Sequence, residues 1–257
     1  MAEPSTGDGV REAWGRVAPR FAAEKADVER RPSMRRLVEL CGLPPTALVL
    51  DVGTGAGFTA FAFAARGCLV VGLDPTHEML LAAREGWRER LLADEPVLVE
   101  AWAEALPFAD GTFDAVVAHR ATHQFASVEE FVAEARRLLK PGGLLGVADQ
   151  SPPDGWEQWH NDLERLRDPT HGRALSPRQW RAVVEGAGLA WREDDLVYQE
   201  HDVEVWLDRV ECPPDRRRGV VRALETIPEE IRGVYRPVLE DGRLVRRTPQ
   251  LVLVATR

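Results

Sequence analysis

The stretch with the clearest chemistry is Val49–Gly57, an apolar run that ends in an acid and three alternating glycines. Gly53, Gly55 and Gly57 carry no Cβ, so the backbone can pass close to a ligand at this turn. Asp51 stands just before the glycines, where a carboxylate repels phosphate and attracts a cation or a polar amine. The turn therefore predicts a nucleotide-type site whose ligand is not a pyrophosphate.

The spacing around this turn distinguishes it from better-known phosphate sites. A dinucleotide fingerprint requires G-x-G-x-x-G, whereas Phe58 occupies the third glycine position here, and no Gly-Lys-Ser/Thr follows as in a P-loop. The next apolar run ends in Asp74, 17 residues beyond Gly57. An acid there can bind both hydroxyls of a ribose. The alternative is that Asp74 only caps the helix that begins near Pro75.

Histidines supply the candidate catalytic groups. His123 follows a predicted strand and is the first candidate for a general base or an acceptor-binding residue, the alternative being a loop histidine that bonds a backbone carbonyl. His119, still on the strand, is expected to be structural or to contact the cofactor. Arg120 between them could bind a substrate carboxylate or an internal acid.

A second ionic group of residues lies in the segment 167–173. Arg167, Asp168 and His171 could form a lid or a substrate clamp, and His171 is a second catalytic candidate; the alternative is a salt-bridged turn that fixes Pro169. Trp156, one helical turn before Trp159, could wall the acceptor site, although a core stripe is the more common outcome at that spacing.

Composition limits the class of protein. The 257 residues are 44% hydrophobic and 29% charged, with a net charge of −9, which argues against broad nucleic-acid or anionic-membrane binding. No apolar run is long enough for a membrane span, and the polar start is unlike a signal peptide. The three cysteines are far apart, and no cluster has metal-ligand spacing. We expect a cytoplasmic protein without zinc or disulfides, acting as a monomer or homodimer.

Hydrophobic patterning predicts alternating strands and helices. After a disordered start over 1–9 and helices over 10–29 and 34–41, strands are expected at 47–52, 68–74, 97–101, 113–119 and 144–149, with helices over 58–66, 76–92 and 127–140 between them. Such alternation predicts an α/β fold with a doubly wound, mainly parallel sheet, whose strand carboxyl ends face a common cleft.

The last third of the chain reads as more helical. Helices are expected over 153–167, 179–186, 203–210 and 215–238, with breaks at Pro228 and Pro237. Strands at 189–198 and 250–256 form an antiparallel pair that closes the sheet edge. We expect one domain over 10–257, in which 151–247 forms a helical cover on the substrate side.

Four segments in order resemble class I S-adenosylmethionine-dependent methyltransferases, especially the small-molecule group around the ubiquinone and menaquinone enzymes. They are Val49–Gly57 (motif I), Val70–Asp74 (motif II), Ala103–Phe108 with Asp110–Asp114 (A-E-x-L-P-F and D-x-S/T-F-D), and Leu138–Gly143 (the helix end after the fourth strand). Arg167–His171 resembles the R-D-P-S/T-H segment of one bacterial subgroup. The resemblance implies a seven-stranded Rossmann-like sheet with an antiparallel edge strand, and N-terminal helices over 10–45 that cover the cofactor.

The resemblance also implies roles around S-adenosylmethionine, which leaves as S-adenosylhomocysteine. Asp51 would orient the turn and reach the methionine ammonium, the turn backbone would pass the methionine and ribose, and Asp74 would hold the ribose. The implied cofactor residues are Phe21, Asp51, Gly53, Thr54, Gly55, Gly57, Asp74, Pro75, Met79, Ala103, Glu104 and His119. Trp102 stands where relatives carry an acid for the adenine amine, so either Glu104 or a backbone carbonyl replaces that contact, or Trp102 stacks in the adenine pocket.

The sequence therefore predicts methyl transfer to a small, partly apolar acceptor by in-line displacement. The expected acceptor residues are Arg120, His123, Trp156, Arg167, Asp168 and His171. The alternatives are a non-methylating protein of the same fold, an NAD-dependent oxidoreductase, and an RNA methyltransferase, which the acidic charge disfavours. The expected partner is a small molecule, without nucleic acid or a membrane span.

Overall fold

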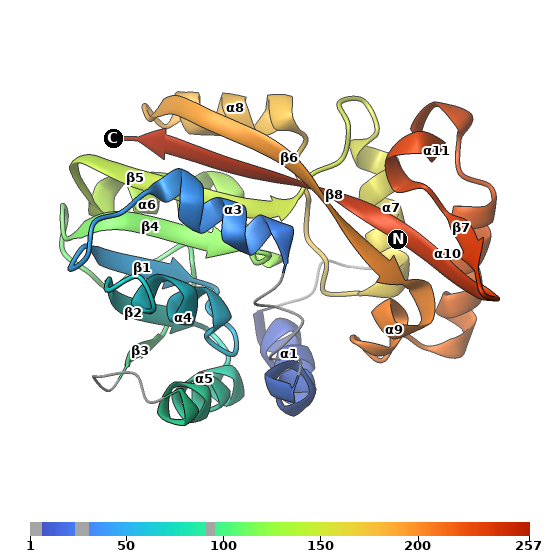
Figure 1. Ribbon diagram of the computed structural model, residues 1–257, viewed down its shortest axis with the longest axis horizontal. Helices are drawn as coiled ribbons and strands as arrows, with labels where there is room; N and C mark the ends of the chain where they lie inside the picture. Colours follow the sequence, from blue (N-terminus) through green and yellow to red (C-terminus); the bar gives the residue numbers. More distant parts are fainter. Residues whose placement is uncertain (1–6, 24–30, 91–95) are drawn as a thin grey trace.

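The computed structural model describes residues 7–23, 31–90 and 96–257 of the chain (Figure 1). An eight-stranded sheet forms its centre, with seven strands in the order β3-β2-β1-β4-β5-β8-β6 and β7 paired to β8. The strands are β1 (Leu48–Val52), β2 (Leu69–Asp74), β3 (Val97–Glu100), β4 (Phe113–His119), β5 (Leu139–Gln150), β6 (Ala190–Asp202), β7 (Val238–Glu240) and β8 (Arg243–Thr256). The predicted doubly wound α/β class is confirmed.

The parallel part of the sheet comprises β1 to β5. In register, Asp51 of β1 pairs with Gly72 of β2 and Val117 of β4. The reversal of strand order lies between β1 and β4, and ligands in such sheets bind beyond the carboxyl ends near that point. The antiparallel pair predicted at the sheet edge is present, with β8 between β5 and the edge strand β6.

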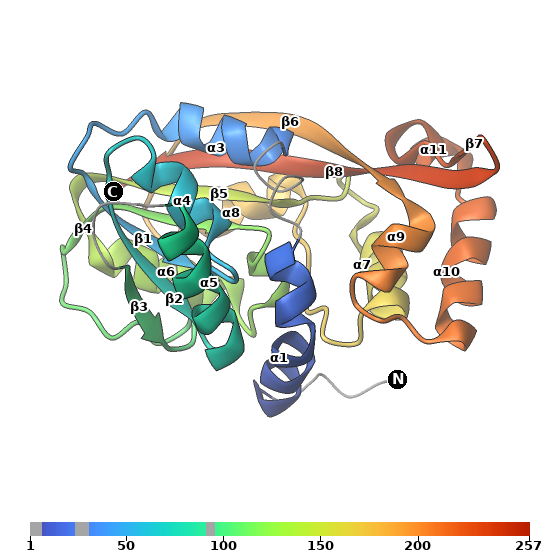
Figure 2. The same ribbon diagram turned by 60° about the horizontal axis from the view of Figure 1, so that its bottom comes forward.

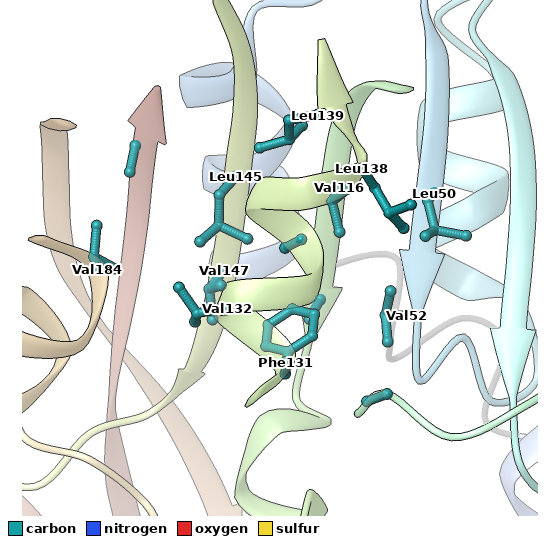
Figure 3. Close-up of a cluster of buried hydrophobic side chains, with 14 of the residues drawn as sticks. Leu50, Val52, Val116, Phe131, Val132, Leu138, Leu139, Leu145, Val147 and Val184 are labelled. Atoms are coloured by element: carbon teal, nitrogen blue, oxygen red, sulfur yellow. The ribbon is translucent and has the colours of Figure 1, made fainter. Parts of the chain in front are cut away.

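Alternation along the central strands distributes side chains to two apolar layers. Leu50 and Val116 point to one layer, whereas Val49 and Val117 point to the other, as strand geometry requires. Figure 3 shows the first layer, in which Phe131 of α6 (Val128–Leu138) packs on the sheet. Helix α8 (Pro177–Gly186) covers the same layer, and α3 (Pro32–Cys41), α4 (Phe58–Ala64) and α5 (His77–Glu89) cover the other.

A helical cluster lies beyond the carboxyl ends of β4 and β5, at the right in Figure 1. It contains α7 (Glu157–Arg167), α9 (Val203–Asp208), α10 (Pro214–Glu225) and α11 (Glu229–Tyr235). The cluster has apolar cores of its own around Trp206 and Tyr235. Helix α1 (Gly7–Ala23) lies at the bottom of both views (Figures 1 and 2) and packs on α5. It also contacts the helical cluster, through an ion pair of Arg16 with Glu211 at 2.9 Å and a hydrogen bond from Arg20 to the Asp208 carbonyl.

Several predicted boundaries differ from the structure. Residues 7–9, expected to be disordered, form the first turn of α1, and 1–6 and 24–29 lie outside the described residues. The helix predicted over 215–238 is two helices broken at Pro228, as expected, but Val238 begins β7. Strands β6 and β8 extend further than predicted because they pair with each other from Ala190 to Asp202, well past the sheet.

Candidate functional site

A cavity opens at the carboxyl ends of β1, β2 and β4, beneath α1. It encloses about 1170 Å³ of empty space, including its open mouth. Predicted cofactor and acceptor residues share its wall: Phe21, Gly53, Thr54, Gly55, Asp74, Pro75, Met79, Ala103, Glu104, His119, Arg120, His123, Arg167 and Asp168. Asp51, Gly57, Trp156 and His171 do not line it. The topology thus brings most of the predicted site together from strand ends that are far apart in the sequence.

The glycine turn is built as the sequence predicts. The backbone N–H groups of Gly53 and Thr54 donate to the carbonyl of Leu73, at 2.8 and 2.9 Å, which ties the turn to β2. Gly53 and Gly55 both have positive φ, at 71° and 52°, and residues other than glycine rarely adopt this backbone conformation. A Cβ at Gly53 would lie 2.5 Å from Ala121 Cβ, whereas one at Gly55 would meet no protein atom within 4 Å.

Asp51 lies beneath this turn and is fully buried. Its Oδ2 accepts a 2.6 Å hydrogen bond from the Thr54 hydroxyl. Burial raises the pKa of Asp51 to about 7, although the Thr54 hydrogen bond opposes the rise. Asp51 does not line the cavity, whereas Thr54, to which it is bonded, does.

Asp74 sits at the end of β2 with its carboxylate in the cavity wall. Its Oδ2 accepts from the N–H of Gly55 and its Oδ1 from the N–H of Thr76, each at 2.9 Å. Asp74 therefore bonds the turn that precedes α5, whose N-cap is Thr76, and each carboxylate oxygen keeps a second lone pair that a ligand can use. Burial raises the pKa of Asp74, and these backbone donors offset part of the effect.

The rest of this half of the cavity is suited to a nucleoside. Apolar side chains from α1 and α5, among them Trp14, Phe21 and Met79, pack together above Asp74. Trp102 also lines the cavity, with the guanidinium of Arg11 5.1 Å from its ring centroid. Glu104 also lines the cavity, but its Oε1 already accepts hydrogen bonds from the backbone N–H groups of Ala126 and Ser127, just before α6. An acceptor carboxylate, open space at Gly55 and apolar walls fit the ribose and base of S-adenosylmethionine.

His119 and His123 occupy different environments. His119 is buried, and its Nε2 lies 3.0 Å from the hydroxyl of Ser33 on α3. Burial, together with the nearby charges of Arg120 and Arg31, lowers its pKa well below the usual value, so His119 is neutral. This bond to α3 supports the structural role that the sequence left open.

His123 lies on η1 (Thr122–Gln124), at the acceptor end of the cavity. Its Nδ1 is 2.8 Å from Asp149 Oδ1, and none of the described residues hydrogen bonds to its Nε2. Asp149 is held in turn by the Thr122 hydroxyl at 2.6 Å and the Gln150 N–H at 2.7 Å. Burial would raise the pKa of Asp149, but the charge and hydrogen bonds of His123 hold it well below its ordinary value. The pair is a histidine oriented by a buried carboxylate.

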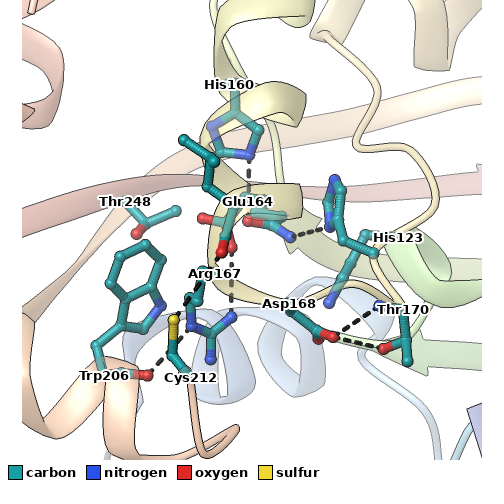
Figure 4. A network of polar contacts seen from close by, with 12 residues as sticks. His123, His160, Glu164, Arg167, Asp168, Thr170, Trp206, Cys212 and Thr248 are labelled. Atoms are coloured by element: carbon teal, nitrogen blue, oxygen red, sulfur yellow. Dashed lines mark hydrogen bonds and ion pairs between the residues drawn. The ribbon is translucent and has the colours of Figure 1, made fainter. Parts of the chain in front are cut away.

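Behind His123 lies a layer of buried polar side chains (Figure 4). The ring of His171 stacks on that of His123, with centroids 5.5 Å apart and planes 27° apart. His171 Nε2 is 2.7 Å from Asn161 Oδ1, and its Nδ1 is 3.5 Å from Gln150 Nε2. His160 connects Gln150 Oε1, at 3.1 Å, to the hydroxyl of Tyr235, at 2.8 Å. His171 thus supports His123 from behind the wall.

The segment 167–171 is a turn with one face in the cavity. Asp168 Oδ1 accepts from the N–H and the hydroxyl of Thr170, and its Oδ2 accepts from Gln124 Nε2 at 3.1 Å. Arg167 instead pairs with Glu164, at 3.3 Å, and donates to the Trp206 carbonyl (Figure 4). Arg167 and Asp168 both line the cavity, but none of these bonds joins one to the other.

Trp156 lies elsewhere. It precedes α7 and packs with Ile227, Ile231 and Tyr235 of the helical cluster, as the core-stripe alternative anticipated. Among the cavity residues that were not predicted as site residues are two arginines, Arg31 just before α3 and Arg209 just after α9. Isolated arginines carry no sequence signal of a site. Asp149 ends a predicted strand, so its position was expected but not its pairing with His123.

No group of three or more His, Cys, Asp or Glu side chains within the described ranges could hold a metal ion. No helix in these ranges has the length and apolarity that crossing a membrane requires.

Comparisons with known proteins place this site in context. Residues 50–147 match the family described as "Methyltransferase domain". The Bacillus subtilis protein YcgJ, described as an uncharacterized methyltransferase, is 32% identical over 189 residues, which cover 73% of this chain and 74% of YcgJ. The demethylmenaquinone methyltransferase of Thermus thermophilus is 40% identical over 148 residues, covering 54% of this chain and 65% of the enzyme.

Solved structures agree over most of the chain. The crystal structure of YcgJ superposes with a TM-score of 0.82 at 27% identity, covering 88% of this chain and 97% of YcgJ. That of a Bacillus halodurans protein described as a methyltransferase gives a TM-score of 0.80 at 30% identity, covering 87% of this chain and 97% of that protein. These similarities support the methyltransferase interpretation over the oxidoreductase alternative.

Proposed function

This chain belongs to the class I S-adenosylmethionine-dependent methyltransferases, and on that basis we propose that it methylates an oxygen or nitrogen atom of a small-molecule acceptor with His123 as the base. The observation that carries the proposal is the pair of His123 and Asp149 at the acceptor end of the cavity.

The cofactor half of the proposal rests on residues that the structure brings together. When bound, S-adenosylmethionine supplies an electrophilic methyl group. We propose that Asp74 accepts the ribose hydroxyls, that the backbone at Gly53 and Gly55 lies along the cofactor, and that Met79 and Phe21 contact the base. Asp51 would hold the turn in shape through Thr54.

The base follows from hydrogen bonding around His123. Because an ionised Asp149 can only accept, the Nδ1 of His123 must carry the proton of that hydrogen bond. A neutral ring then has its lone pair on Nε2. That nitrogen can take the proton of an acceptor hydroxyl or amine while the heteroatom attacks the methyl carbon. Asp149 fixes the tautomer and stabilises the imidazolium that forms.

We assign His171 a positioning role. It stacks on His123 without lining the cavity, so it limits rotation of the base and does not contact the acceptor. Arg120, Arg167 and Asp168 complete the acceptor wall.

We further propose a small acceptor and a cytoplasmic location. The net charge of −9 is unfavourable for binding nucleic acid. Relatives of this chain include a demethylmenaquinone methyltransferase and, from Saccharothrix syringae, a nocamycin O-methyltransferase, and small-molecule acceptors of these kinds fit this proposal.

The test is an acceptor screen that uses mass spectrometry to detect methylated products, followed by His123→Asn on the best acceptor. Asn keeps a donor for Asp149 but has no basic nitrogen. We expect turnover to fall by about 10²- to 10⁴-fold, the usual contribution of a general base. Affinity for S-adenosylhomocysteine, measured by calorimetry, should stay within about twofold, since His123 lies at the acceptor end.

His77→Asn is the matched control, because His77 is exposed at the start of α5 and does not line the cavity. Undiminished turnover in His123→Asn would remove His123 as the base.

A further inference from the structure

We infer that the acceptor carries an anionic group, a carboxylate or a phosphate, which Arg120 binds at the acceptor end of the cavity. The inference rests on the proposed function and specifies the class of its acceptor.

Arg120 has an unusual backbone and an incompletely satisfied side chain. It directly follows β4 with φ of 54°, and its N–H donates to the carbonyl of Ala148 at 2.7 Å. A non-glycine residue in this region costs energy, and strained residues of this kind cluster at active sites and ligand-binding turns. Of the five such residues in the described ranges, Arg120 is the one that lines the cavity. Its Nη1 is buried in the cavity wall and has no hydrogen-bond partner among the described residues. A buried donor on a cation is costly until an acceptor arrives.

More arginines converge on the same wall from other parts of the chain. Arg31 precedes α3, Arg167 is the last residue of α7, and Arg209 follows α9. All three side chains are buried and line the cavity. Burial and the charges of Arg31 and Arg209 lower the pKa of Arg120, as they would for cations crowded together. An arginine stays charged even so, and the wall of the cavity therefore contains four guanidinium groups.

Among the described residues, the carboxylates near this wall already have partners, and Asp149, whose charge also acts on Arg120, pairs with His123. Asp168 accepts from Thr170 and Gln124 through its two oxygens. Glu164, behind the wall, lies 3.3 Å from Arg167 and 3.6 Å from the buried Arg246. Burial would raise the pKa of Glu164, but these two arginines lower it to about 2. Figure 4 shows Glu164 beside Arg167. One carboxylate shared by two guanidiniums leaves this group with a net positive charge.

The two halves of the cavity therefore differ in charge. The half beneath α1 contains the carboxylates of Asp74 and Glu104, whereas the half near His123 contains the arginines and one carboxylate, that of Asp168. Guanidinium groups bind carboxylates and phosphates with paired, charge-assisted hydrogen bonds. The cofactor brings one anion, its methionine carboxylate, which could also use an arginine, so the experiment must separate the two anions.

The test uses the whole chain saturated with S-adenosylhomocysteine and titrated with inorganic phosphate or succinate by calorimetry. We expect Arg120→Gln to weaken anion binding by about tenfold or more, as loss of a charge-assisted hydrogen bond predicts. Arg120→Lys should retain part of the affinity. Arg181→Gln is the matched control, because Arg181 is exposed on α8, pairs with Glu185 and loses the same charge.

A second arm compares acceptor pairs in the methylation screen, such as hydroxybenzoates, hydroxyalkyl phosphates and the esters that neutralise each anion. We expect the wild type to methylate the anionic member of each pair with a kcat/KM about tenfold or more above that of the ester. The Arg120→Gln variant should show no such preference. The preferred pair also distinguishes carboxylate from phosphate.

Two results would overturn the inference. One is wild-type protein that binds S-adenosylhomocysteine but neither anion. The other is an Arg120→Gln protein that loses affinity for S-adenosylhomocysteine while anion binding is unchanged, since Arg120 would then serve the cofactor carboxylate. A wild type that does not bind S-adenosylhomocysteine, seen before any anion is added, would instead contradict the proposed function.

Discussion

Asp51 and Asp74 are both buried acids beside the glycine turn, but only Asp74 lines the cavity. Asp51 is bonded to Thr54, and its raised pKa reflects a carboxyl enclosed by protein. Each oxygen of Asp74 accepts from one backbone N–H group, and the residue lines the cavity. Two residues of the same type thus differ in role because of a difference in access to the cavity.

Asp74→Ala tests the cofactor assignment. The substitution removes the proposed ribose contacts and the two backbone hydrogen bonds that hold Gly55 and Thr76. We expect affinity for S-adenosylhomocysteine, measured by calorimetry, to fall by about tenfold to a hundredfold. Asp74→Asn keeps the shape and one acceptor oxygen, so it should lose less. An unchanged dissociation constant for Asp74→Ala would remove Asp74 from the ribose site.

The turn between β1 and α4 shows how an element, and not one residue, shapes the cavity. The N–H groups of Gly53 and Thr54 donate to the Leu73 carbonyl of β2, and the two glycines that line the cavity have positive φ. Gly53 faces Ala121, whereas Gly55 faces open space. The first glycine therefore permits packing between two strand ends, and the second leaves room for a ligand.

Gly53→Ala and Gly55→Ala form a matched pair that separates these effects. Both place alanine at positive φ, which costs about 1–2 kcal/mol. Only Gly53→Ala also forces a Cβ to 2.5 Å from Ala121 Cβ, so we expect it to lower the free energy of unfolding more. Gly55→Ala should chiefly weaken S-adenosylhomocysteine binding. Urea unfolding and calorimetry measure the two quantities, and equal stability losses would contradict the packing argument.

At the level of the whole molecule, a buried polar layer joins the sheet to the helical cluster. Gln150 at the end of β5 contacts His160 of α7, which contacts Tyr235 of α11. Desolvation by burial is the main cause that lowers the pKa of His160 to about 4 and that of His171 to about 3. Both rings are therefore neutral in the folded protein at neutral pH.

This layer should make stability depend on pH. His160 binds a proton near pH 6.5 in the unfolded chain but only near pH 4 in the folded protein. Its contribution to the free energy of unfolding is therefore fully present above pH 6.5 and is lost as the pH falls toward 4. The shift corresponds to a loss of about 3 kcal/mol for His160. His160→Gln, which keeps a hydrogen-bonding side chain, should flatten this part of the profile, measured by urea unfolding at several pH values.

The exposed His77→Gln is the control and should follow the wild type. The Glu164 carboxyl, whose pKa is about 2, loses its contribution only below its unfolded pKa near 4.5, so it does not account for a change between pH 6.5 and 4. Identical slopes for His160→Gln and the wild type would contradict a buried neutral His160.

The sequence alone determined the sheet class, the glycine turn and Asp74, because strand periodicity and turn glycines are local properties of adjacent residues. It also placed His123 at a strand end. Only the tertiary structure decided that Asp149 orients His123, that His171 stands behind the wall, that Trp156 belongs to another core, and that Arg31 and Arg209 join Arg120. Those pairings join segments tens of residues apart, and their physical basis is burial and charge balance, which no local pattern records.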